Sequence, residues 1–105
     1  MSLQAIVLSL ISDIDDPAVR MDISSTIYFL RDVYLDGKIS DEGLEKELRE
    51  IVNTVLSATH PELLPEERKK RADDFVKQLM RAIKLSTLRM RALSRFRSRY
   101  RPEFE

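Results

Sequence analysis

The residues best suited to chemistry in this chain are the cations of its last third. No carboxylate occurs between Phe75 and Pro102, whereas nine Lys and Arg side chains accumulate there. Because a guanidinium group can bind a phosphate through two parallel hydrogen bonds, a segment rich in arginine favours a phosphate-bearing partner. Eight of these cations are candidate nucleic-acid-binding residues: Lys77, Arg81, Lys84, Arg91, Arg95, Arg97, Arg99 and Arg101.

Helical spacing would gather most of these cations on one face. At about 100° per residue, six of them lie within about 40° of one direction, and apolar side chains occupy the opposite arc. Aromatic residues alternate with arginines near the end of the chain, as stacking on unpaired bases requires. The same arc is also a candidate partner interface, formed by Met90, Leu93, Phe96 and Tyr100.

The segment from Asp32 to Leu44 resembles the calcium-binding loop of an EF-hand. Asp32, Asp36 and Gly37 stand at loop positions 1, 5 and 6. The resemblance fails at position 12, where calcium requires a bidentate carboxylate and the chain has Gly43. We therefore interpret this segment as a turn between two helices and expect no metal there.

No other residues form a catalytic or metal-binding pattern. His60 is the only histidine and has no cysteine nearby, so we expect it to be a loop residue. The acidic cluster of Asp13, Asp15 and Asp16 is interpreted as a solvated turn that caps a helix. Glycine-rich phosphate loops and nucleophile elbows are absent from the sequence. We expect neither an enzyme nor a cofactor.

The formal net charge is zero, yet the two parts of the chain carry opposite charge. Residues 1–67 hold 5 Lys and Arg against 14 Asp and Glu, a net of −9, whereas residues 68–105 hold 13 against 4, a net of +9. The basic part therefore seeks an anionic partner, either phosphate or the acidic part of its own fold. In the second case, arginines of the last helix would neutralise Asp36, Asp41 and Glu42.

Length and composition restrict the class of protein. A chain of 105 residues fits a single domain, and without cysteine it forms no disulfide. Its apolar runs are far shorter than the roughly 18 residues that span a membrane. Because the N-terminus also lacks the basic region of a signal peptide, we expect a cytoplasmic protein without membrane contact. Arg outnumbers Lys by 12 to 6 and side-chain amides are few, which is a feature of some thermophilic proteins.

Glycine and proline divide the chain into four long segments with helical periodicity. The pattern predicts an all-α fold, a small antiparallel bundle forming one domain over residues 1–105. Helices are expected from a Ser2 cap to about Ile14, from Pro17 to about Asp36, from a Ser40 cap over roughly 18 residues, and over residues 66–101. A break near Ser86 would divide the last segment and add a fifth, short helix.

The last predicted helix is the longest. At 1.5 Å per residue, roughly 35 residues extend about 52 Å, which is about twice the length of the preceding helix. We therefore expect an extended basic helix that overhangs the bundle. Since no bundle helix would cover the overhang, its apolar arc should pair in a dimer or dock on another protein.

The sequence favours two functions, and neither is enzymatic. The first is a nucleic-acid-associated protein that binds DNA or RNA through the basic face of the last helix. The second is a protein–protein adaptor or accessory subunit of a larger complex, docking through the apolar face of the same helix. In both cases we expect a homo-oligomer or a subunit of a larger assembly.

Overall fold

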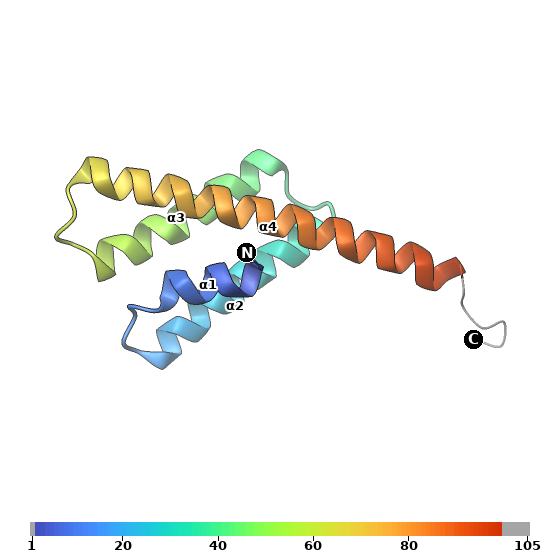
Figure 1. Cartoon of the computed structure of the whole chain (residues 1–105), viewed down its shortest axis with the longest axis horizontal. Helices are drawn as coiled ribbons and strands as arrows, with labels where there is room; N and C mark the ends of the chain where they lie inside the picture. Colours follow the sequence, from blue (N-terminus) through green and yellow to red (C-terminus); the bar gives the residue numbers. More distant parts are fainter. Residues whose placement is uncertain (1, 100–105) are drawn as a thin grey trace.

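The computed structural model describes residues 2–99, which form a small antiparallel bundle of four α-helices, as the sequence predicts (Figure 1). The helices are α1 (Leu3–Ile11), α2 (Pro17–Leu35), α3 (Asp41–Thr59) and α4 (Pro65–Arg99). α3 and α4 lie side by side, and α1 packs against both α4 and α2. The longest helix, α4, thus contacts every other helix.

Three of the helices begin where the sequence predicts, each after a side chain that caps its N-terminus. Ser2, Asp16 and Ser40 accept hydrogen bonds from the backbone N–H groups of Ala5, Ala18 and Gly43 at 3.1, 2.9 and 3.0 Å. Each bond satisfies one of the donors that a helix N-terminus leaves without an intrahelical partner. After α2, Gly37 adopts a left-handed φ of 73°, which turns the chain toward α3.

α1 ends three residues earlier than the sequence predicts, at Ile11 instead of about Ile14. The N–H of Ile14 bonds to the carbonyl of Ile11, three residues back, so the chain has already left the α-helical pattern. Asp16 must be extended because it precedes a proline, and the short acidic linker favours turns over helix. Ile14 still packs against the core from this turn.

The hydrophobic core receives residues from all four helices. Its fully buried side chains include Val7 of α1, Ile27 of α2, Leu48 of α3, and Leu79 and Ile83 of α4. These residues form one continuous core, against which partly buried side chains such as Ile23 and Phe75 also pack. The packing fixes the direction in which α4 leaves the bundle.

α4 continues through Ser86 and Thr87 without a break, so the alternative of a fifth helix is wrong. The Thr87 hydroxyl donates to the carbonyl of Lys84 at 3.0 Å, which satisfies it within the helix. Thr87 is 2% exposed, so the helix is still buried at this position. Every residue from 88 to 97 is exposed, and Figure 1 shows this part projecting beyond the other helices. We call residues 88–99 the arm.

Within the described part of the chain, none of the helices has the length and apolar character required to cross a membrane.

Candidate nucleic-acid interface

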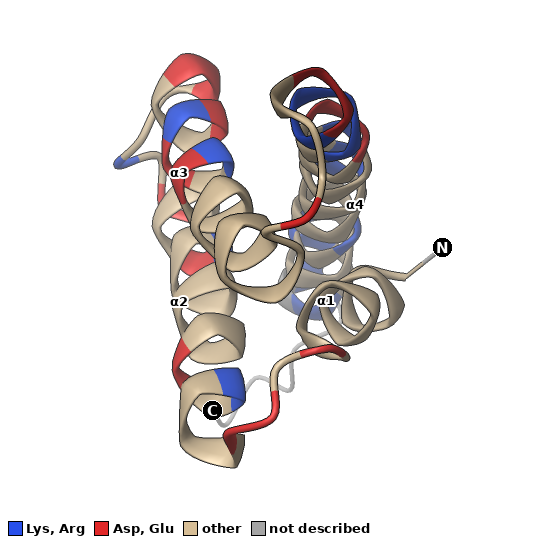
Figure 2. Ribbon diagram, turned by 90° about the vertical axis from the view of Figure 1, so that its left-hand side faces the viewer, with Lys and Arg blue, Asp and Glu red and all other residues tan. Residues whose placement is uncertain are grey.

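The basic residues of α4 lie on the surface of the helix. Lys77, Arg81, Lys84, Arg91, Arg95 and Arg99 are all exposed. Figure 2 shows the contrast in charge, with Asp and Glu on the α1–α2 connection and along α2 and α3, and Lys and Arg along much of α4. These six residues, the basic stripe, follow one side of the helix because they recur at spacings of three, four and seven.

Lys84 is held at the place where α2 ends and α3 begins. Its Nζ lies 3.1 Å from Oδ2 of Asp41, and the Tyr34 hydroxyl donates to Oδ1 of the same carboxylate at 2.8 Å. The hydrogen bonds from Tyr34 and Lys84 lower the pKa of Asp41, and the bond to Asp41 raises the pKa values of Tyr34 and Lys84. Asp41 therefore stays ionised at neutral pH and keeps Lys84 charged.

Arg91 is the second stripe residue used inside the molecule. Its Nη2 donates to the carbonyl oxygen of Leu35 at 3.4 Å. This carbonyl belongs to the last turn of α2, where helical carbonyls lack intrahelical donors and a cation is favoured. Arg91 also borders a surface groove of about 570 Å³, lined further by Leu35, Met90, Leu93, Ser94 and Arg97. Lys84, just before the arm, and Arg91, near its start, together hold α4 to the beginning of α3 and the end of α2.

The other four stripe residues remain available. Within residues 2–99, no hydrogen bond or ion pair engages Lys77, Arg81, Arg95 or Arg99. Lys77 and Arg99 are 22 residues apart, which corresponds to about 33 Å along the helix. Arg97 lies on another side of α4, in the groove, and Arg101 is outside the described residues. Lys84 and Arg91, which the sequence predicts to bind nucleic acid, thus differ from the other four stripe residues because they already have partners within the molecule.

The predicted partner interface is exposed where the structure describes it. Met90, Leu93 and Phe96 are 40%, 46% and 61% exposed, and Tyr100 lies outside the described residues. The arm thus presents apolar side chains that no other helix of the bundle buries.

Exposed apolar residues elsewhere were missed by the sequence reasoning. Leu85 and Leu88 are 56% and 64% exposed on α4, next to the basic stripe. On α2, Phe29 is 64% exposed and Met21 is 69% exposed. The sequence indicates the exposure of Phe29, because this residue lies outside the helical face that Ile23, Ile27 and Leu30 share.

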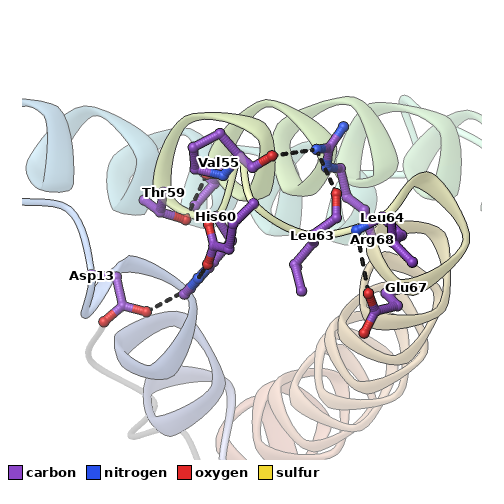
Figure 3. A network of polar contacts seen from close by, with 10 residues as sticks. Asp13, Val55, Thr59, His60, Leu63, Leu64, Glu67 and Arg68 are labelled. Carbon is purple, nitrogen blue, oxygen red and sulfur yellow. Dashed lines mark hydrogen bonds and ion pairs between the residues drawn. The ribbon is translucent and has the colours of Figure 1, made fainter.

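His60 joins two loops at the opposite end of the bundle (Figure 3). Its Nε2 lies 2.8 Å from Oδ2 of Asp13, and its Nδ1 lies 3.1 Å from Oε1 of Glu62. Both partners are acceptors, so the ring satisfies both only as the imidazolium. The hydrogen bonds to Glu62 and Asp13 accordingly raise the pKa of His60. His60 is therefore a link between the α1–α2 and α3–α4 connections as well as a loop residue.

The neighbouring loop is held by Arg68 and Glu67. Arg68 Nη2 donates to the carbonyl oxygens of Leu63 and Pro61 at 3.2 and 3.5 Å, and the N–H of Leu64 donates to Glu67 at 3.3 Å. These contacts hold the α3–α4 connection against the first turn of α4. Among residues 2–99, no group of His, Asp and Glu side chains has an arrangement that could hold a metal ion.

Comparison with known proteins returned no similarity: the chain matches no family model, and no curated protein or solved structure matches it significantly.

Proposed function

We propose that this protein is a non-enzymatic nucleic-acid-binding protein whose phosphate contacts are made by Lys77, Arg81, Arg95 and Arg99. The observation that carries the proposal is the exposure of four cations along one side of α4, none with a partner among residues 2–99. Because they project from a single helix held by the core, they form a fixed row about 33 Å long. A row of cations without bound carboxylates is suited to a phosphate backbone.

The salt dependence of binding tests this proposal quantitatively. Each neutralised phosphate releases counterions and contributes about −0.7 to −0.9 to the slope of log K against log salt. Four contacts therefore predict a slope of about −2.8 to −3.6, and affinity should fall about 50- to 150-fold between 50 and 200 mM salt. Fluorescence anisotropy with single- and double-stranded DNA and RNA oligonucleotides measures this slope.

A matched pair of variants separates the stripe from net charge. Arg95→Glu with Arg99→Glu should halve the slope and weaken binding strongly. Lys46→Glu with Lys69→Glu makes the same change in net charge at exposed positions away from the stripe, and it should leave the slope near wild type. Equal loss in both double variants would reduce the effect to overall charge, and no binding to any oligonucleotide at 50 mM salt would refute the proposal.

A second candidate function is a protein–protein adaptor or accessory subunit. The specific observation in its favour is the exposure of Met90 and Leu93 beside the groove on the arm, since nucleic acid backbones do not recognise such side chains. Under this function the oligonucleotide titrations give no signal. Leu93→Asp then abolishes binding to the partner protein while the helical content stays unchanged.

A further inference from the structure

The arm has two faces that differ in chemistry. Met90 and Leu93 lie about 60° apart on the helical wheel, and Arg97 lies between them. Arg89 lies about 70° from the mean direction of Met90 and Leu93. Arg95 and Arg99 lie roughly 150–170° from that mean direction. We call the side bearing Met90, Leu93, Arg89 and Arg97 the inner face. Phosphate contacts from the stripe therefore leave the inner face unoccupied.

α2 carries a surface of the complementary kind. Asp22, Phe29 and Asp36 recur every seven residues, so they line one side of the helix, and all three are exposed. Val19 and Met21 flank this line and are 42% and 69% exposed. We call these five residues the α2 outer face. It is apolar at its centre and carries only negative charge.

The cations of α2 do not neutralise this face. Arg31 is partly buried, forms an ion pair with Asp32 at 3.2 Å and lies over the Tyr28 ring, 5.2 Å from its centroid. Arg20 is also partly buried and lies about 180° from Phe29 on the wheel. Among residues 2–99, Asp22 and Asp36 have side chains without an ion-pair partner. They are therefore available to external cations.

We propose that the arm binds the α2 outer face of a second copy of this chain. The charge on the two surfaces is opposite, since the inner face carries Arg89 and Arg97 and the α2 outer face carries Asp22 and Asp36. Each surface also has exposed apolar side chains at its centre, Leu93 on one and Phe29 on the other. Opposite charge at the rim and apolar contact at the centre are the pattern of a specific protein interface.

A reciprocal dimer uses both surfaces twice. The arm projects past the C-terminal end of α2, so it points away from the N-terminal half of its own α2 (Figure 1). It extends only about 18 Å, which makes one contact small beside the interfaces of stable complexes. In a twofold dimer each copy contributes one arm and one α2 outer face, and the buried area doubles. The basic stripe stays exposed in this arrangement.

Complementary charge reversals test the dimer. We expect light scattering to give the mass of two chains for the wild type at tens of micromolar. The double variant Arg89→Asp with Arg97→Asp and the double variant Asp22→Arg with Asp36→Arg should each weaken the dimer at least about 30-fold and run as monomers. An equimolar mixture should restore a dimer containing one copy of each, because every arm then meets an α2 outer face of opposite charge.

The control is Arg95→Asp with Arg99→Asp, which changes the charge of the same helix equally and should leave the dimer intact. Circular dichroism of each variant establishes that the bundle is folded. A monomeric wild type overturns the proposal, as does an α2 double variant that remains dimeric or a mixture that does not associate. Since the dimer and the phosphate contacts use different arginines, either proposal can fail while the other stands.

Discussion

Leu79 and Leu93 lie on the same side of α4, about 40° apart on the helical wheel, so the difference in their burial measures where the bundle ends. Leu79 is 0% exposed, whereas Leu93, fourteen residues later, is 46% exposed. Truncation of a buried leucine to alanine costs about 2.7–5.0 kcal/mol, because both the transfer free energy and the packing of the cavity are lost. Truncation of an exposed leucine costs less than about 0.5 kcal/mol.

These free energies convert into different melting temperatures. With 105 residues, the entropy of unfolding is about 0.22 kcal/mol/K near 60 °C. Leu79→Ala should therefore lower the melting temperature by about 12–23 °C, and Leu93→Ala, measured where the protein is dilute, by about 2 °C or less. Thermal unfolding followed by circular dichroism, with both variants measured in the same buffer, gives the comparison.

Protein concentration separates the bundle from the proposed dimer. Leu93 lies at the centre of the inner face, so Leu93→Ala should lower the melting temperature more at roughly 50-fold higher concentration than at low micromolar concentration, because dimer stability depends on mass action. At low concentration the small effect should persist. A loss for Leu93→Ala equal to that for Leu79→Ala under dilute conditions would refute the boundary of the bundle at Thr87.

Two further predictions concern the connections between helices. Because the pKa of His60 is raised above its ordinary 6.5 in the folded protein, its contribution to stability is complete below 6.5 and is lost as the pH rises through the raised pKa. The difference in melting temperature between wild type and His60→Asn should therefore shrink between acid and mildly alkaline pH; a difference independent of pH contradicts the link to Asp13 and Glu62. Gly37→Ala should cost about 1–2 kcal/mol in urea unfolding, because φ is +73° there, and Gly37→Asn should cost less.

The starts of the helices and the turn after α2 could be predicted from the sequence because they depend on local chemistry. The caps at Ser2, Asp16 and Ser40 bond to N–H groups two or three residues away, and Gly37 needs only its own φ. The end of α1 was misplaced because its apolar periodicity continues to Ile14 after the helix has ended. Periodicity records which residues reach the core, and a turn can carry one there as well as a helix.

The partners of the basic stripe, in contrast, could not be predicted from the sequence. Helical spacing placed Lys84 and Arg91 on the same face as Arg95, which is correct. Their partners, Asp41 and the carbonyl of Leu35, are 43 and 56 residues away in the sequence, so only the packing of α4 against the end of α2 and the start of α3 shows them. The sequence predicted that arginines of α4 would neutralise Asp36, Asp41 and Glu42, but among residues 2–99 the one ion pair to these acids is formed by a lysine, Lys84, with Asp41.

The separation of charge explains why this bundle should look outward for partners. The two parts of the chain carry −9 and +9, and a compact fold could cancel much of this by pairing them. Among residues 2–99, only the Lys84–Asp41 pair joins a cation of the basic part to a carboxylate of the acidic part. The Arg49–Asp73 pair has the opposite sense and uses one of the few minority charges on each side. Since a core of apolar side chains holds the helices, the charges are left at the surface, with the positive ones concentrated along α4. Phosphates would neutralise the cations of the basic stripe, and the α2 outer face of a second chain would neutralise those of the inner face. Salt should weaken both contacts.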